Sequence, residues 1–171
     1  EDSLNGVFEE QAVTQYERKI VFSSLSQMMA DIVLSFSPSV NAAYKKNKSS
    51  LGACQTAVLN KLNRVESQVS QALVRYSYAE ARAIGNHLRT GDASYIAGYR
   101  TKILDGNHLS GTEHRIEAIR AERAAALPGK SLVVLDPRLR LIQDYFPIED
   151  GHAQERSALD EVIKTIESKD L

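Results

Sequence analysis

The sequence predicts an all-α protein, an antiparallel helical bundle with two long helices and an irregular crossover before the last helix. Apolar residues recur three or four positions apart over much of the chain, which is the spacing of one helical face. Few helix breakers interrupt its first half, and turn signals divide the remainder into shorter pieces. A length of 171 residues suits one core, so we expect a single domain over residues 1–171.

Composition excludes several classes of protein. A hydrophobic content of 43% with 25% charged residues is enough for a core and excludes wholesale disorder. The net charge of −1 gives no general reason to bind nucleic acid or an anionic membrane. No apolar run approaches the roughly 18 residues that span a bilayer. The single Cys54 excludes an internal disulfide and a multi-thiolate metal site, and we expect it to behave as a small buried hydrophobe.

The first long helical segment is predicted from about Gly6 to Lys48. Its apolar residues fall on one helical face: Val21, Leu25, Met28, Ile32 and Phe36. Pro38 lacks an amide donor and clashes with the preceding turn, so Ser37-Pro38-Ser39 should kink or interrupt the segment.

The second long helix is predicted to run without a break over at least Val58 to Leu88. Its apolar residues alternate spacings of four and three: Val58, Leu62, Val65, Val69, Ala72, Tyr76, Ala79 and Ala83. This 3.5-residue repeat is the pattern of a coiled-coil or bundle seam, and it would also suit a homodimer. We therefore expect Val65, Val69, Ala72 and Tyr76 to be substantially buried.

Turn and cap signals divide the middle of the chain. Gly91 and Asp92 can end one helix and begin the next. Asp105-Gly106-Asn107 predicts a turn. Ser110 and Glu113 have the spacing of a capping box, which would open a helix that stops at Pro128-Gly129.

The irregular crossover lies between Pro128 and Gly151. Leu132–Leu135 is an apolar run too short to distinguish a strand from buried extended chain, and both alternatives stay open. Asp136-Pro137 fits a helix start, which predicts two helical turns over Arg138–Tyr145. A final helix is expected over roughly Ala153–Glu167.

Motifs for catalysis or metal binding are not apparent. The four histidines show neither an i, i+4 pair nor an HExxH motif: His87, His108, His114 and His152. The sequence contains no nucleophile elbow, phosphate-binding loop or dinucleotide fingerprint. We therefore expect a protein that is not an enzyme, has no metal site and requires no cofactor.

A stripe of arginines seven residues apart flanks the predicted seam at Arg75, Arg82 and Arg89. One interpretation is that these side chains form ion pairs that select a partner helix. The alternative is a binding site for a small anion beside the alanine-rich part of the seam, because the guanidinium fork suits carboxylate or phosphate. Under that alternative Arg75 and Arg82 would contact the ligand, with Tyr78 supplying contact area.

The stretch from Ala79 to Tyr99 resembles the central segment of extracytoplasmic helical sensor domains in bacterial chemoreceptors and sensor kinases. In those families a long helix often ends in a Leu-x-Thr-Gly-Asp turn followed by an aromatic stripe. The residues that carry the resemblance are Leu88, Thr90, Gly91, Asp92, Tyr95 and Tyr99. It implies a periplasmic sensing domain that transmits a signal through helix packing.

Two functional hypotheses result. The first is a non-catalytic extracytoplasmic sensing domain that binds a small anionic ligand. The second is a secreted or periplasmic helical interaction protein, such as an immunity protein, an inhibitor or an assembly factor, which binds a protein partner. The absence of an initiator Met is compatible with a mature chain or with a fragment of a longer one.

Overall fold

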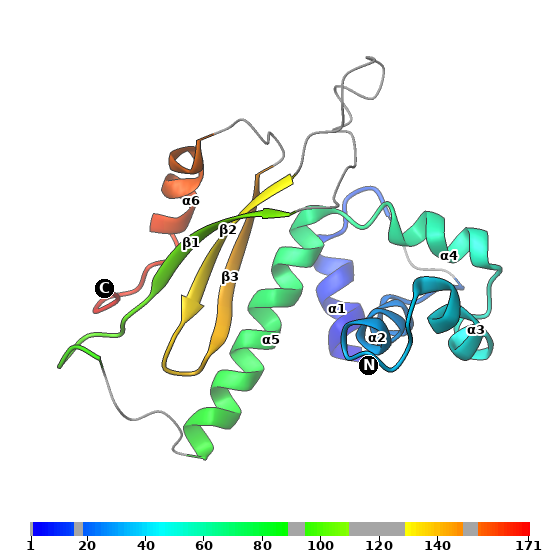
Figure 1. The fold of residues 1–171 in the computed structure, drawn as a ribbon, viewed down its shortest axis with the longest axis horizontal. Coiled ribbons are helices and arrows are strands. Elements are labelled where there is room, and N and C mark those ends of the chain that lie inside the picture. Colours follow the sequence, from blue (N-terminus) through cyan, green and yellow to red (C-terminus); the bar gives the residue numbers. More distant parts are fainter. Residues whose placement is uncertain (1, 16–18, 89–94, 110–128, 149–153) are drawn as a thin grey trace. The chain divides into compact units, whose positions relative to one another are not determined.

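The computed structural model describes residues 2–15, 19–88, 95–109, 129–148 and 154–171. It combines helices with a three-stranded antiparallel sheet, so the predicted all-α bundle is wrong (Figure 1). Contacts between Cα atoms divide the chain into two compact units, Glu1–Leu73 and Val74–Leu171. The expectation of a single domain stays a prediction.

Among its described residues, unit 1 contains four helices and the start of a fifth. These are α1 (Asp2–Gln11), α2 (Phe22–Val33), α3 (Val40–Leu51), α4 (Gln55–Leu62) and α5 (Ser67–His87), of which α5 continues into unit 2. The interruption predicted at Ser37-Pro38-Ser39 is confirmed, since α2 ends before it and α3 begins after it. The Ser39 side chain accepts a hydrogen bond from the Ala42 amide at 3.2 Å and so caps α3.

The long helix predicted over Val58–Leu88 is broken between Leu62 and Ser67. Amides at Arg64 and Val65 bond to carbonyls three residues back, which tightens and ends the last turn of α4. The Glu66 carboxylate then accepts hydrogen bonds from the amides of Val13 and Thr14 and from the Thr14 hydroxyl, at 2.7 to 2.9 Å. These bonds tie the α4–α5 junction to the loop after α1, and local periodicity cannot reveal them.

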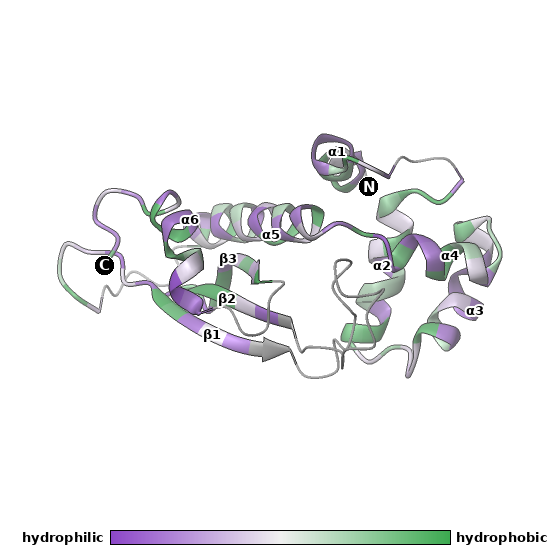
Figure 2. Ribbon diagram, turned by 90° about the horizontal axis from the view of Figure 1, so that it is seen from above, coloured by the Kyte–Doolittle hydropathy of each residue, from purple (hydrophilic) through white to green (hydrophobic). Residues whose placement is uncertain are grey.

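The part of the predicted seam that lies in unit 1 is a core contact, and the prediction of a coiled coil is wrong. Val69 is completely buried in a cluster with Phe8 and Phe22, whose rings stack with centroids 5.0 Å apart. Val65, Ala72 and Tyr76 are only half-buried, while Ala79 and Ala83 are exposed. Figure 2 shows hydrophilic and hydrophobic bands alternating along α5. The first half of the apolar pattern therefore serves the core and the second half does not.

Unit 2 contains the sheet, which the sequence analysis missed. Strands β1 (Ile103–Leu109), β2 (Gly129–Asp136) and β3 (Leu141–Ile148) pair in the order β1-β2-β3. Asp105-Gly106-Asn107, predicted to be a turn, lies within β1. The apolar run of Leu132–Leu135 is part of β2, which settles the alternative that the sequence left open. The predicted helix over Arg138–Tyr145 is instead the turn of a β-hairpin and most of β3.

The hairpin turn explains why Asp136-Pro137 looked like a helix start. The Asp136 carboxylate accepts hydrogen bonds from the amides of Arg138 and Leu139 at 3.0 and 3.1 Å, as a helix-capping aspartate does. Arg140 then adopts a left-handed conformation with φ of 56°, and the chain turns back into β3. The local capping geometry is present, but it closes a hairpin.

One face of the sheet carries the core of unit 2. Leu132, Val134, Phe146 and Ile148 pack there against Val162. Val162 belongs to α6 (Leu159–Ile163), which follows the short 3₁₀ helix η2 (Glu155–Ala158). The last helix is thus shorter than the predicted Ala153–Glu167, and Ile163 and Ile166 on its expected apolar face are exposed.

Two predicted features lie outside the described residues. They are the helix break at Gly91-Asp92 and the helix opened by the Ser110–Glu113 capping box. Cys54 precedes α4 and is exposed, contrary to the expected burial.

We predict that Val69→Asp destabilises the fold by more than about 3 kcal/mol, because it places an unpaired charge in a dry cluster of aromatic rings. The matched control is Ile84→Asp on the same helix, since Ile84 is 59% exposed. Its cost should stay below about 1 kcal/mol. Urea unfolding followed by circular dichroism measures both changes. Equal losses in the two variants would contradict the assigned burial of Val69.

Candidate functional site

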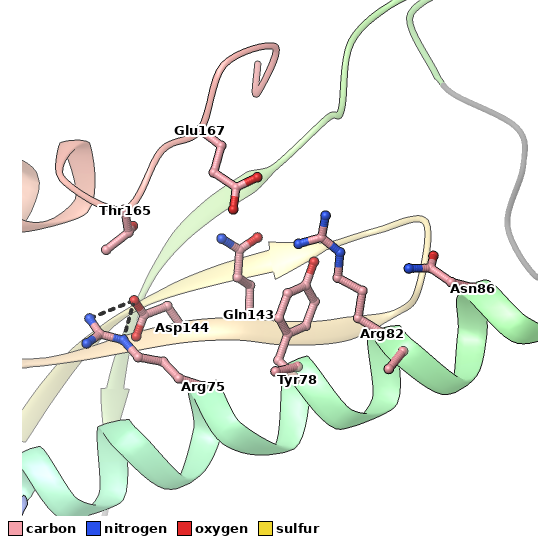
Figure 3. A pocket seen from close by; sticks show the side chains of 10 residues that line it. Arg75, Tyr78, Arg82, Asn86, Gln143, Asp144, Thr165 and Glu167 are labelled. Atoms are coloured by element: carbon pink, nitrogen blue, oxygen red, sulfur yellow. Dashed lines mark hydrogen bonds and ion pairs between the residues drawn. The ribbon is translucent and has the colours of Figure 1, made fainter. Parts of the chain in front are cut away.

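A pocket of about 460 Å³ in unit 2 brings together all three residues that the sequence analysis singled out (Figure 3). Arg75, Tyr78 and Arg82 line it from α5, where spacings of three and four place side chains on one helical face. The other lining residues come from α5, β3 and the segment after α6: Ala79, Ala83, Asn86, Gln143, Asp144, Thr165 and Glu167. Whether the three residues bind a ligand stays a prediction.

Arg75 is engaged in an ion pair with Asp144. Its Nε and a terminal nitrogen each lie 2.9 Å from the same carboxylate oxygen, Oδ2. The Asp144 side chain is only 3% exposed, and its Oδ1 accepts the Tyr145 amide at 2.8 Å. The Arg75 guanidinium also lies 5.9 Å from the centre of the Phe146 ring. A buried carboxylate needs such a partner, so Arg75 attaches α5 to β3.

Tyr78 is also engaged on the protein side. Its hydroxyl donates to Asp136 Oδ2 at 2.8 Å and accepts from Lys102 Nζ at 3.3 Å. Lys102 Nζ in turn lies 2.9 Å from the same Asp136 oxygen. Burial and the neighbouring Asp136 carboxylate together raise the pKa of Tyr78 well above its ordinary value. The tyrosine is therefore neutral, with its ring lining the pocket and its hydroxyl directed into the sheet.

The pKa of Asp136 shifts in the opposite direction. Burial alone would raise it, but hydrogen bonds from Lys102, Tyr78 and the Leu139 amide outweigh burial and lower the pKa below its ordinary value. The carboxylate is ionised at neutral pH, and its two oxygens accept from α5, from the residue before β1 and from the hairpin turn.

Arg82 differs from Arg75. Within the part of the chain that the structure describes, no hydrogen bond or ion pair engages its guanidinium, and Figure 3 shows the side chain reaching into the pocket beside Tyr78. The other lining charges have partners, because Asp144 pairs with Arg75 and Glu167 pairs with Arg100 at 3.0 Å. The positive charge of Arg82 is thus the one that a ligand could neutralise.

Gln143 enters the pocket because of an irregularity in the sheet. The register of β2 and β3 shifts between Val134 and Leu135, which pair with Asp144 and Ile142, so Gln143 is the extra residue of a β-bulge. Its Oε1 is buried and has no hydrogen-bond partner among the described residues. A bulge re-aims a side chain, and here it offers an amide to the pocket. The sequence contains no local signal for this bulge.

Unit 1 contains a second, mainly apolar pocket of about 600 Å³. Its lining includes Leu25, Met29, Val33, Leu62 and Leu73. Ser26 Oγ is buried without a partner among the described residues, but no charged side chain lines the pocket. This pocket has few groups that could orient a small ligand.

Neither a candidate metal site nor a membrane-spanning helix is found among the described residues. In the ranges that the structure describes, no group of three or more His, Cys, Asp and Glu side chains could hold a metal ion. None of the described helices has both the length and the apolar character needed to cross a bilayer. The expectation that the protein needs no metal or cofactor stays a prediction.

Comparisons with known proteins do not identify a relative. No protein-family model matches the chain, and neither curated proteins nor solved structures give a significant match. The resemblance to sensor domains therefore stays a prediction.

We predict that the free energy of unfolding falls as the pH is lowered from 6 towards 3, in part because Asp136 is protonated. A carboxyl group with a lowered pKa in the folded state contributes stability above its unfolded pKa, and this stability is lost as the pH falls through the folded pKa. Asp136→Asn should therefore lower stability at pH 6 and reduce this dependence on pH. Urea unfolding at several pH values measures how the free energy of unfolding depends on pH. Asp105→Asn is the control, because Asp105 is exposed. An unchanged pH profile in Asp136→Asn would contradict the assignment.

Proposed function

We propose that this chain is a non-catalytic domain that binds a small anionic ligand in the pocket of unit 2, with Arg82 as the principal contact. The observation that carries the proposal is the charge balance of the pocket: Arg82 lacks an ionic partner among the described residues, whereas Asp144 and Glu167 have theirs. A guanidinium group can bind a carboxylate or a phosphate through two parallel hydrogen bonds. The pocket volume is within the range of small-molecule sites.

The roles of the three predicted residues are revised in this proposal. Arg75 would position α5 against β3 through Asp144, and Tyr78 would present only its ring to the ligand. Ala79 and Ala83 leave room beside Arg82, and Asn86 lies one turn further along α5. A ligand with one anionic group and a small apolar part fits these surroundings.

The wider biological role rests on the sequence alone. The extracytoplasmic location and the sensing role stay proposals that derive from the resemblance to sensor domains. Signalling through a helical-bundle seam is not part of the proposal, because the fold combines helices with a sheet and the seam residue Val69 is buried within unit 1.

We predict that a small carboxylate, phosphate or sulfonate raises the melting temperature of the wild-type chain and that Arg82→Ala abolishes the shift. A ligand at 100 times its dissociation constant stabilises the folded state by about 2.7 kcal/mol. A thermal-shift screen identifies the anion, and titration calorimetry measures its affinity. Arg64→Ala is the matched control, since Arg64 is an exposed arginine outside the pocket.

Arg75→Ala tests the structural role of the other arginine. It should lower stability by about 1–3 kcal/mol in the absence of ligand, because it removes the partner of a buried carboxylate. Two results would contradict the proposal: no anion shifts the melting temperature, or the shift persists in Arg82→Ala. Recovery of a stoichiometric protein partner in the same circumstances would favour the interaction-protein hypothesis.

A further inference from the structure

The two walls of the pocket in unit 2 differ in their hydrogen-bonding chemistry. The α5 wall carries Arg75 and Arg82, whose guanidinium groups can donate hydrogen bonds but cannot accept them. Arg75 pairs with Asp144, whereas no hydrogen bond or ion pair engages the Arg82 guanidinium among the described residues. Asn86, on the same helix, has an amide that can donate or accept. This wall therefore suits the anionic group of a ligand.

The opposite wall, formed by β3 and the segment after α6, presents hydrogen-bond acceptors (Figure 3). Gln143 Oε1 is buried and has no hydrogen-bond partner among the described residues. The Thr165 hydroxyl donates its proton to the Val162 carbonyl oxygen at 2.8 Å, so it can only accept from a ligand. The Glu167 carboxylate is 58% exposed and can likewise only accept. This wall suits a group of the ligand that donates a hydrogen bond.

The charges that line the pocket balance one another. Among the described lining residues, two arginines are matched by two carboxylates: Arg75 and Arg82 by Asp144 and Glu167. A ligand with two negative charges would bring an excess of negative charge close to these carboxylates, and like charges repel more strongly in a site that is partly shielded from water. The pocket therefore suits one anionic group, placed at Arg82, and a donor that reaches the wall of Gln143.

We propose that the ligand is a small acid that carries an N–H or O–H donor beside its anionic group, and that Gln143 selects for this donor. This selection rests on the proposed function, because the anionic group is assigned to Arg82. A buried acceptor without a partner is costly, so an acid that supplies a donor gains affinity that an acid without one does not. The β-bulge contributes to the selection, since Gln143 is its extra residue.

Propionate, lactate and the free amino acid alanine are the probes. They share a carbon skeleton and a carboxylate, and they differ in one substituent, which is hydrogen, hydroxyl or ammonium. Titration into the full chain, followed by NMR chemical shifts, gives a dissociation constant for each probe. Lactate and alanine should each bind at least about tenfold more tightly than propionate, which is the effect of one hydrogen bond to a buried group.

Variants of Gln143 separate selection from folding. Gln143→Met keeps a similar length and removes the amide, so the preference over propionate should fall below about threefold while the affinity for propionate stays unchanged. Gln154→Ala is the matched control and should keep the wild-type preference, since Gln154 is an exposed glutamine outside the pocket. If Gln143→Met does not fold, Gln143→Glu provides the test, because its carboxylate should raise the affinity for alanine relative to lactate.

The results distinguish failure of this selection from failure of the proposed function. Equal affinity for the three probes in the wild-type chain, with all binding lost in Arg82→Ala, would overturn the selection and leave the anion site intact. The same conclusion would follow if none of the three probes binds while another anion shifts the melting temperature. If no anion binds, the proposed function fails as well. An unchanged preference in folded Gln143→Met, or an unchanged ratio of alanine to lactate affinity in Gln143→Glu, would overturn the assignment of Gln143.

Discussion

The Asp136 carboxylate is the interaction on which the arrangement of unit 2 most depends. It lies at the end of β2 and accepts hydrogen bonds from Tyr78 on α5, from Lys102 before β1 and from the amides of the hairpin turn. One buried charge thus connects a helix, an edge strand and a turn. Because a buried carboxylate without partners is costly, these three elements can change position only together.

The position of the candidate pocket follows from this network. Tyr78 is fixed by Asp136, and Arg75, three residues earlier, is fixed by Asp144. Two anchors within one turn determine which face of α5 is directed to the sheet, and Arg82 lies one turn beyond them on that face. The bulge at Gln143 adds an amide from β3. The pocket is therefore a consequence of two ion-pair networks that orient the helix.

Local features of the fold could be predicted from the sequence, whereas contacts between residues far apart in the sequence could not. The helix break at Ser37-Pro38-Ser39 and the clustering of Arg75, Tyr78 and Arg82 could be predicted, because proline chemistry and helical spacing are local properties. The sheet was missed because β3 contains a buried Asp144 and a Pro147, which conceal the apolar alternation of a strand. The buried Asp144 pairs with Arg75, which lies 69 residues away in the sequence. The hydrogen bonds that Glu66 accepts from Val13 and Thr14 are also long-range, and they lie at the junction where the predicted helix is broken.

Charge pairing also distinguishes Arg82 from Arg75, Arg100 and Lys102 in unit 2. Lys102, Arg75 and Arg100 bind Asp136, Asp144 and Asp170, and the side chains of these three aspartates are each less than 10% exposed. Each pair joins segments that are distant in the sequence, so these cations have a role in the fold itself. Arg82 lines the pocket of unit 2, and no such partner is found for it among the described residues. An anion in the pocket would supply the partner that Arg82 lacks among the described residues, and the proposed function is based on this.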